Sequence, residues 1–490
     1  MRILLVCPEA PDSFWSLKNA LRFTAKKGML PPLGLLTVAA MLPADWEARL
    51  IDMSIEPLHD RDILWADYVF LTGMYVQRRR VDAIIERCHR LGTKTVAGGP
   101  IFTSIPEDYD HVDHLILGEA EVSLPPFIAD LRAGRARHIY RSEDWADVGT
   151  SPAPRWDLIN MRKYLLMGIQ FSRGCPFACD FCNVTALFGR RMRTKTTEQW
   201  IAELDALYAQ GWRGDVFVVD DNFIGNKTLL KDRVLPAMID WMRRHKRPFK
   251  FNTQVSINLA DDDELMRLMA EAGFDCVFVG IETANEAGLA ECNKTQNIDR
   301  DMVDCVRRIQ RAGMQVQAGF ILGFDSDHAS VFDGLIRFIQ ESGIVSAMVG
   351  LLNAPKGTQL YQRLVNENRL LEDGSGDNTD FSMNFVPTMD RDELLNGYRK
   401  VVQTIYAPRA YYQRISTFMN NYVPAAPHGG RFRWSDLRTI ARSMWHIGIR
   451  NRGRRYYWRL LGRSLLHPEQ LRLNLTFAIY GFHFRRVFKV

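Results

Sequence analysis

The stretch Phe171-Ser-Arg-Gly-Cys-Pro-Phe-Ala-Cys-Asp-Phe-Cys182 sets Cys175, Cys179 and Cys182 in a CxxxCxxC pattern directly after an apolar, strand-like run. Three thiolates at this spacing can hold three irons of a 4Fe-4S cluster and leave the fourth iron open. The alternatives are three buried structural cysteines or a zinc knuckle. A four-ligand zinc site would need a second Cys/His pair nearby, and the next cysteine is Cys276.

Length and composition predict a globular protein of about three domains. The chain has 490 residues, of which 47% are hydrophobic and 24% charged. The apolar run from Met1 to Cys7 is too short for a signal peptide and predicts a first β-strand. No apolar run approaches the roughly 20 residues that span a bilayer. With three of eight cysteines assigned to a cluster, no disulfide framework is expected, which predicts a cytoplasmic protein.

Residues 1–140 alternate apolar runs with helical patterns, which predicts a doubly wound, flavodoxin-like parallel sheet. The expected strands are Ile3–Cys7, Ala48–Asp52, Tyr68–Thr72, Thr95–Gly98 and His114–Gly118, and the expected helices are Leu33–Leu42, Val81–Leu91 and Val122–Leu131. Ligands bind such sheets at the carboxyl ends of the strands, where small residues gather in this chain. The alternative is that these glycines only close tight turns.

Residues 141–160 are polar, contain Pro152 and Pro154, and are predicted to be a linker. A second series of strands and helices follows in residues 161–385, and Thr197 is expected to cap the helix after the cysteines. The expected strands are Leu166–Phe171, Asp215–Val219, Phe249–Gln254, Cys276–Ile281, Gln315–Ile321 and Val345–Leu351. Six units are too few for a closed eight-stranded barrel, so we predict an open (β/α)6 partial barrel with a lateral mouth.

The strand ends of this second series, together with the cysteine motif, resemble those of radical SAM enzymes. The segment Gly319-Phe-Ile-Leu-Gly323-Phe-Asp325 is close to their GxIxGxxE motif, with Asp in place of Glu. The resemblance implies that the open iron binds S-adenosylmethionine (SAM) and that Phe181 lies beside the adenine. The SAM-binding residues that it implies are Phe181, Asp220, Asp221, Asn222, Gln254, Ser256, Glu282, Gly319 and Gly323.

A doubly wound domain ahead of such a barrel resembles the cobalamin-dependent branch of these enzymes. Phe14-Trp15-Ser16 and residues 220–226 resemble the subgroup with hopanoid and bacteriochlorophyll methylases. No DxHxxG motif occurs, so no histidine is expected below the cobalt, and Tyr75 or Gln77 is the candidate for that place. The implied cobalamin-binding residues are Thr72, Gly73, Met74, Tyr75, Gln77, Gly98, Gly99, Pro100, Gly118 and Glu119.

The resemblance implies a C-methyltransferase that acts on an unactivated carbon of an apolar (lipid- or tetrapyrrole-like) or secondary-metabolite substrate. The cluster would cleave SAM with an electron from a donor such as flavodoxin or ferredoxin, and methylcobalamin would supply the methyl group. Two alternatives are a cobalamin-dependent cyclase or rearrangement enzyme without methyl transfer, and an RNA-modifying radical SAM enzyme. No added RNA-binding domain is recognisable, so nucleic acid is not the expected partner.

The C-terminal extension, residues 386–490, ends in a basic, aromatic-rich tail. Residues 431–490 carry 14 Arg or Lys and two Asp or Glu, a net charge of +12 in a chain whose total is +6. This pattern suits an anionic membrane surface or nucleic acid, whereas the alternative is helices that pack on the barrel. We predict peripheral binding at the inner membrane face. The aromatic residues are Phe432, Trp434, Trp445, Tyr456, Tyr457, Trp458, Phe477, Tyr480, Phe482 and Phe484.

Overall fold

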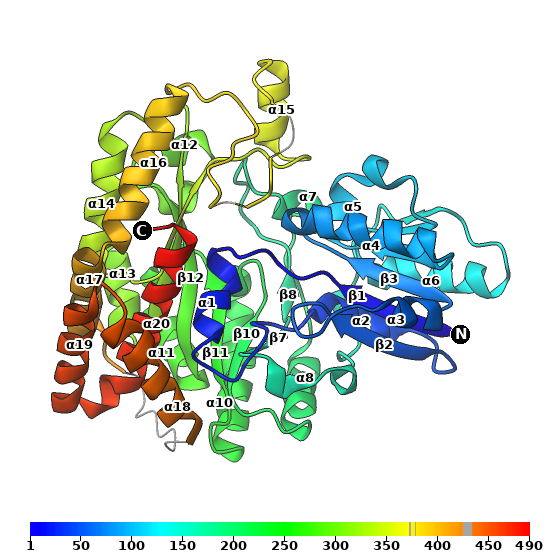
Figure 1. Cartoon of the computed structure of the whole chain (residues 1–490), viewed down its shortest axis with the longest axis horizontal. Helices are drawn as coiled ribbons and strands as arrows, with labels where there is room; N and C mark the ends of the chain where they lie inside the picture. Colours follow the sequence, from blue (N-terminus) through cyan, green and yellow to red (C-terminus); the bar gives the residue numbers. More distant parts are fainter. Residues whose placement is uncertain (372–373, 378, 425–433) are drawn as a thin grey trace.

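The computed structural model describes residues 1–371, 374–377, 379–424 and 434–490, and it places two parallel sheets side by side (Figure 1). The first sheet has the strand order β2-β1-β3-β4-β5-β6. Every neighbouring pair is parallel, which confirms the predicted doubly wound fold. The strands are β1 (Arg2–Cys7), β2 (Glu47–Asp52), β3 (Tyr68–Thr72), β4 (Lys94–Gly98), β5 (His114–Leu117) and β6 (Ile139–Arg141).

Both faces of this first sheet are buried, as continuous apolar strands require. Along β1, Ile3 and Leu5 belong to one core, whereas Leu4 and Val6 belong to a second core on the opposite face. The helices that cover the sheet are α2 (Leu33–Met41), α3 (Asp60–Trp65), α4 (Arg78–Arg90), α5 (Pro100–Ser104) and α6 (Ala120–Arg132).

Residues 141–160 are packed between the two sheets rather than exposed along their length. Ala146, Val148 and Trp156 are buried, and the segment forms two short 3-10 turns, Val148–Thr150 and Trp156–Leu158. The sequence did not predict strand β6, which pairs with β5 and ends at Arg141.

The second sheet is open and wholly parallel, with the order β14-β13-β12-β11-β10-β7, which confirms the predicted partial barrel. Its strands are β7 (Met167–Ile169), β10 (Asp215–Val218), β11 (Lys250–Val255), β12 (Phe274–Glu282), β13 (Gln315–Leu322) and β14 (Ala347–Leu351). Its main outer helices are α8 (Thr197–Ala209), α10 (Leu235–Arg244), α11 (Asp263–Ala272), α13 (Met302–Arg311) and α14 (Ser330–Ser342). The cap of α8 is Thr196, whose hydroxyl accepts the Gln199 N–H, so the prediction of Thr197 was wrong by one residue.

The C-terminal helices lie against the outside and the open side of the barrel (Figure 1). They are α16 (Arg391–Tyr406), α17 (Pro408–Asn421), α18 (Trp434–Ser443), α19 (Arg454–Leu466) and α20 (Leu471–Val487). Helix α20 packs on α1 (Lys18–Leu21), and the ring of Phe484 stacks on Phe14 with centroids 4.2 Å apart. The N-terminal segment and the last helix therefore meet beside the barrel strands.

Most aromatic side chains of the tail are packed inside the protein, not displayed on its surface. Tyr457, Phe477, Phe482 and Phe484 are buried, whereas Trp445 and Trp458 are 49% and 43% exposed. Phe432 and the side chain of Trp434 lie outside the described residues. In the part of the chain that the structure describes, no helix combines the length and the apolar character needed to cross a bilayer.

Candidate functional site

The three motif cysteines lie in a half-buried loop between β8 (Ser172–Arg173) and α7 (Val184–Phe188). Gly174 starts this loop at φ +90°, and a Cβ there would meet the Arg191 carbonyl oxygen at 2.7 Å, so only glycine fits. Burial raises the pKa of all three thiols, that of Cys182 to about 12. Bound metal reverses this preference because it favours the thiolate.

A buried ion pair lies beside the cysteines. Strand β12 ends at Glu282, whose φ is +65°, and its carboxylate is 2.7 Å from the ammonium of Lys294. Burial alone would lower the pKa of Lys294, but Glu282 and the Cys179 thiol raise it. The amide nitrogen of Gln296 is 4.0 Å from Cys179 Sγ, and its buried Oε1 has no hydrogen-bond partner within the described chain. No sequence motif pointed to Lys294 or Gln296, since they enter the site from the turn after α12 (Glu286–Glu291).

Two of the three predicted residues after β10, Asp220 and Asp221, hold the cysteine loop in place. Asp220 is fully buried, and its carboxylate accepts the Phe171 N–H at 2.8 Å and the Ser172 hydroxyl at 2.5 Å. Burial raises the pKa of Asp220 to about 7. Asp221 accepts the Gly174 N–H at 3.1 Å, so both carboxylates position the loop that carries the thiols.

The ends of the neighbouring strands β10 and β11 carry the predicted residues Asn222, Gln254 and Ser256. Asn222 accepts the Ser256 N–H at 3.2 Å, and the Ser256 hydroxyl donates to Asn258 at 2.6 Å. Gln254 is half-buried on the inner face of β11, and its side-chain amide makes no hydrogen bond to the described residues. Phe181 is half-buried, with its ring 6.4 Å from that of Phe324.

The predicted glycines of the barrel face other protein atoms. A Cβ on Gly319 would lie 3.0 Å from the Phe278 ring, and one on Gly280 would lie 2.3 Å from the Glu282 carboxylate. Gly323, at φ +108°, would meet Leu394 of α16 at 3.2 Å. These glycines thus make room for neighbouring side chains of the protein.

At the carboxyl edge of the first sheet, the side-chain amide of Gln77 forms hydrogen bonds within the protein. Its amide donates to the Pro8 carbonyl at 2.6 Å and accepts the Met74 N–H at 2.9 Å, so it joins the turns after β1 and β3. Met74 is 55% exposed, Thr72 and Tyr75 are half-buried, and a Cβ on Gly73 would meet Val81 at 2.7 Å.

The remaining predicted cobalamin residues follow β4 and β5. A Cβ on Gly98 would lie 2.8 Å from the Ile116 carbonyl oxygen. Gly99 has φ +98°, and a Cβ there would lie 2.5 Å from the Thr72 hydroxyl oxygen. Gly118 has φ +76° and open space around it. Pro100 begins α5, and α5 packs on α7, the helix that follows Cys182. The edge of the first sheet therefore adjoins the cysteine loop.

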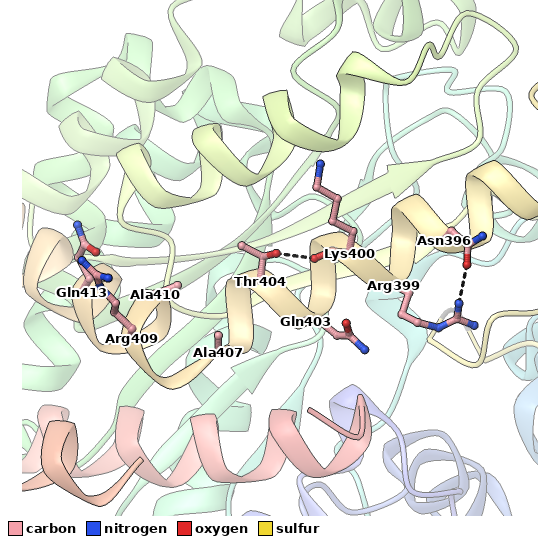
Figure 2. A pocket seen from close by; sticks show the side chains of 9 residues that line it. All are labelled: Asn396, Arg399, Lys400, Gln403, Thr404, Ala407, Arg409, Ala410 and Gln413. Carbon is pink, nitrogen blue, oxygen red and sulfur yellow. Dashed lines mark hydrogen bonds between the residues drawn. The ribbon is translucent and has the colours of Figure 1, made fainter. Parts of the chain in front are cut away.

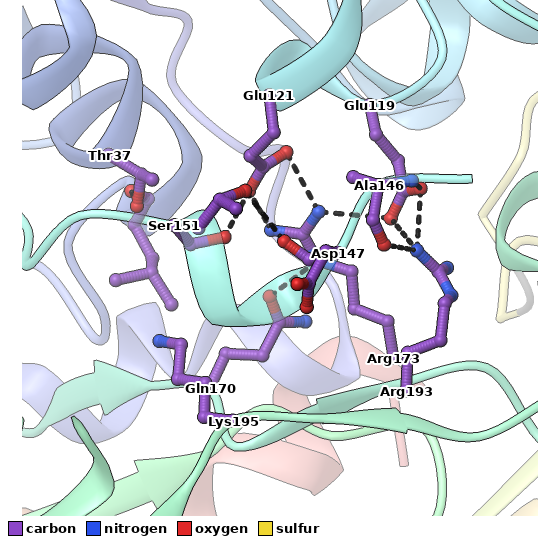
Figure 3. A network of polar contacts seen from close by, with 12 residues as sticks. Thr37, Glu119, Glu121, Ala146, Asp147, Ser151, Gln170, Arg173, Arg193 and Lys195 are labelled. Carbon is purple, nitrogen blue, oxygen red and sulfur yellow. Dashed lines mark hydrogen bonds and ion pairs between the residues drawn. The ribbon is translucent and has the colours of Figure 1, made fainter. Parts of the chain in front are cut away.

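A buried network of charges ties this edge to the cysteine loop (Figure 3). Arg173 lies 3.0 Å from Glu119 and 2.7 Å from Glu121, and Arg193 lies 2.7 Å from Glu119. The Glu119 carboxylate also accepts the Ala146 N–H at 2.7 Å. Glu119 is therefore bonded within the protein at the position where the sequence suggested a cobalamin contact. Arg173 precedes the first cysteine by two residues. Its partners, Glu119 and Glu121, lie more than 50 residues earlier in the chain, so no pattern in the sequence indicated these ion pairs.

A groove of about 700 Å³ lies elsewhere, on the outer surface of α16 and α17 (Figure 2). It is lined by Arg399, Arg409 and Gln413 among others, and contains none of the predicted site residues.

Three family models match successive parts of the chain. The B12 binding domain matches residues 23–128, the radical SAM superfamily matches residues 169–339, and a domain of unknown function (DUF4070) matches residues 358–490. The "Uncharacterized methyltransferase sll1242" of Synechocystis sp. is 39% identical over 99% of this chain and 91% of its own length. The hopanoid C-2 methylase of Rhodopseudomonas palustris is 32% identical over 98% of this chain and 92% of its own.

The chain belongs to the cobalamin-dependent radical SAM methyltransferases. Two solved structures share the fold of this radical SAM methyltransferase. OxsB with aqua-cobalamin and SAM has a TM-score of 0.64 at 13% identity, over 100% of this chain and 80% of that one. TsrM from Kitasatospora setae has a TM-score of 0.58 at 14% identity, over 86% and 91% of the two chains.

The residues of this radical SAM methyltransferase fit its cofactors, a 4Fe-4S cluster, SAM and cobalamin. Three half-buried thiols with a cationic side chain nearby suit a cluster that carries negative charge. Among the described residues, no three His, Cys, Asp or Glu side chains converge on a single metal ion. A cluster makes no such demand, because each thiolate binds a different iron. Gln254 is half-buried, and no atom lies within 4 Å of the place that a Cβ on Gly118 would take.

Proposed function

We propose that this enzyme methylates an unactivated carbon of an apolar, lipid-like substrate. The observation that carries the proposal is the buried network of Glu119, Glu121, Arg173 and Arg193, which fixes the cysteine loop against the carboxyl edge of the cobalamin-type sheet. The relatives support the apolar substrate, since one is named a hopanoid C-2 methylase and another, at 22% identity, a bacteriochlorophyllide d C-12(1)-methyltransferase.

Within this proposal, a bound cluster with SAM would supply the radical chemistry that removes hydrogen from the substrate, and bound cobalamin would supply the methyl group. Cys175, Cys179 and Cys182 hold the cluster, and Asp220 and Asp221 orient their loop. We assign Gln254, Phe181 and Glu282 to SAM, supported by their position at the strand ends. Thr72, Met74 and Tyr75, with the turns at 98–100 and at Gly118, would hold cobalamin. The proposed domains are 1–140, the linker 141–160, 161–385 and 386–490.

The test is an anaerobic incubation of the reconstituted enzyme with SAM, a flavodoxin or ferredoxin as electron donor, and lipid extracts. We expect a product about 14 Da heavier than its substrate, with S-adenosylhomocysteine formed alongside 5′-deoxyadenosine. Formation of 5′-deoxyadenosine without S-adenosylhomocysteine would instead support a cyclase or rearrangement enzyme. Two relatives support that alternative, both named anaerobic magnesium-protoporphyrin IX monomethyl ester cyclase, at 24% identity over 66% of this chain and at 22% identity over 53%.

The tail supports a second, narrower proposal of peripheral contact with anionic membrane. Helix α19 exposes Trp458 together with Leu465 and Leu466, which are 81% and 80% exposed. Trp458 and Leu465 are seven residues apart, so they share one face of the helix. Arg454, Arg455 and Arg459 are exposed on the same helix, and arginines near an anionic surface contribute about 1 kcal/mol each.

Flotation with phosphatidylglycerol vesicles tests this contact. We expect the wild type to float at low salt and to be released at high salt, because the attraction is electrostatic. The double variant Leu465→Ser, Leu466→Ser should stay in the soluble fraction. Leu64→Ser changes an exposed leucine of the first domain (58% exposed) and should float like the wild type. A wild type that remains soluble at low salt contradicts the proposal.

A further inference from the structure

Trp15 lies on the barrel, although it comes from the first domain of the sequence. It belongs to the short turn Phe14–Ser16 that follows β1. Its ring lies edge-on to Phe278 with centroids 5.3 Å apart, and its indole N–H points to the sulfur of Met348 at 2.9 Å. Trp15 nevertheless remains 38% exposed. A large aromatic side chain is thus held against strands β12 and β14 with over a third of its surface open.

Phe278 and Met348 lie on the inner face of the second sheet. Along β11 and β12, half-buried positions alternate with fully buried ones, and the buried ones belong to the core under the outer helices. Phe278 and Gly280 are half-buried positions on the same face of β12, and the carboxylate of the buried Glu282, which pairs with Lys294 beside the cysteines, lies next to Gly280. The strand pairing sets Gln254 and Gln317 opposite Phe278, and Gly319 opposite Met348. Trp15 therefore covers the inner face just before the strand ends that carry the cofactor residues.

The backbone of Trp15 is fixed from several sides. The Phe14 ring stacks on Phe484, and the Phe14 carbonyl lies 3.0 Å from Nε2 of the buried His483. On the other side, the Ser13 N–H donates to the Ser16 hydroxyl at 3.1 Å. The exposed indole is therefore placed by the fold. A fixed, partly open aromatic surface on a concave face is a common feature of ligand sites.

We propose that Trp15, Phe278 and Met348 form the apolar wall of the substrate site, and that this wall takes an uncharged, rigid polycyclic hydrocarbon skeleton. The proposal rests on the proposed function and names its substrate class more closely. The side chains beside the wall, Gln254 and Gln317, are uncharged amides. A carboxylate-bearing macrocycle would need a cation at this level, and the positions opposite Phe278 on β11 and β13 carry none. Two amides suffice for at most a hydroxyl or carbonyl group.

The test measures binding apart from catalysis. The purified protein, without reconstitution, is equilibrated with the hopanoid hydrocarbon diploptene in detergent micelles, and separately with protoporphyrin IX, which bears carboxylates. We expect Trp15→Ala to raise the Kd for diploptene about tenfold. Trp15→Phe, which keeps an aromatic face, should change the Kd by less than about twofold. The matched control is Trp65→Ala, a tryptophan on the first domain that contacts Arg49.

Folding of each variant is monitored by circular dichroism. Should Trp15→Ala fail to fold, Phe278→Leu tests the same wall, and it should also raise the Kd for diploptene. An unchanged Kd for diploptene in folded Trp15→Ala overturns the wall, and preferential binding of protoporphyrin IX by the wild type overturns the substrate class. In the reconstituted enzyme, Trp15→Ala should raise the ratio of 5′-deoxyadenosine to methylated product. If the wild type binds diploptene but forms no methylated product, the proposed function is contradicted. The assignment of the apolar wall is then unaffected.

Discussion

Lys294 provides the charge that most directly affects the cysteines. Its ammonium pairs with Glu282 and lies close enough to Cys179 to raise the pKa of Lys294. An iron–sulfur cluster gains negative charge when it is reduced. A cation near the cluster therefore stabilises the reduced form and raises the reduction potential.

Replacing Lys294 with Gln should accordingly make the midpoint potential of the cluster more negative, because the cation is lost while Glu282 remains. Lys294→Arg keeps the charge and should restore most of the potential. An anaerobic redox titration followed by electron paramagnetic resonance measures both variants. Equal potentials in Lys294→Gln and the wild type, at equal iron content, would show that the pair is purely structural.

Replacing Cys179 with Ala should abolish cluster assembly and SAM cleavage, since each motif cysteine supplies one thiolate. Iron content and 5′-deoxyadenosine formation after anaerobic reconstitution are the measurements. Cys88→Ala is the control, because Cys88 is buried in the core of the first domain. Continued release of 5′-deoxyadenosine by Cys179→Ala would remove the assignment of the cluster.

Among the secondary-structure elements, those that the sequence predicted well are the strands with continuous apolar runs. The bounds of β3 were predicted to the residue, because Tyr68–Thr72 is apolar and followed by glycine. Contacts between distant segments were not predictable. The position of Trp15 depends on Phe484, and that of Arg173 on Glu119 and Glu121, and no local pattern encodes such pairs. The short edge strand β6 was not predicted, because three residues are too few to show a periodic pattern of apolar residues.

The network around Arg173 should contribute strongly to stability, since Arg173, Glu119 and Glu121 expose only 12%, 2% and 5% of their side chains. Removing one partner of a buried ion pair typically costs about 3–5 kcal/mol. We therefore expect Arg173→Met to lower the free energy of unfolding by that order, measured by urea denaturation. Arg155→Gln, which breaks the exposed pair with Asp157, should cost less than about 1 kcal/mol.

The contribution of Glu121 should depend on pH. Arg173 lowers the pKa of Glu121 from 4.5 to about 2, although burial opposes the shift. A carboxyl with a lowered pKa in the folded state stabilises the fold above its unfolded pKa, and this stabilisation is lost as pH falls. The stability difference between wild type and Glu121→Gln should be constant above pH 4.5 and shrink between about pH 4.5 and 2. A difference that grows on acidification would contradict the assigned pairing.

At the scale of the whole molecule, four of the five histidines of the first domain lie at the amino edge of its sheet, away from the edge that faces the barrel: His89, His111, His114 and His138. His114 begins β5 and His89 is near the end of α4, which sets both at the amino edge of the sheet. The fifth, His59, begins α3 in the connection that follows the edge strand β2. The absence of a DxHxxG motif in the sequence agrees with this arrangement.

The enzyme should therefore bind one cobalamin without a histidine ligand from the protein. Electron paramagnetic resonance of the Co(II) form should lack the superhyperfine splitting that an axial nitrogen produces. Such splitting in the loaded wild type would contradict the expectation, and its disappearance in a His59→Ala variant would identify the ligand.

The stacking of Phe14 on Phe484 also has a consequence for synthesis of the protein in the cell. The two rings are separated by 470 residues of chain. At about 5–20 residues per second, a ribosome needs roughly half a minute to a minute and a half to translate that interval. The cysteines and the strands around them emerge well before the helix that holds Trp15 in position. The nascent barrel is thus open on the side of Trp15 until translation nears its end, so iron–sulfur assembly factors meet a less covered barrel during synthesis than in the finished protein.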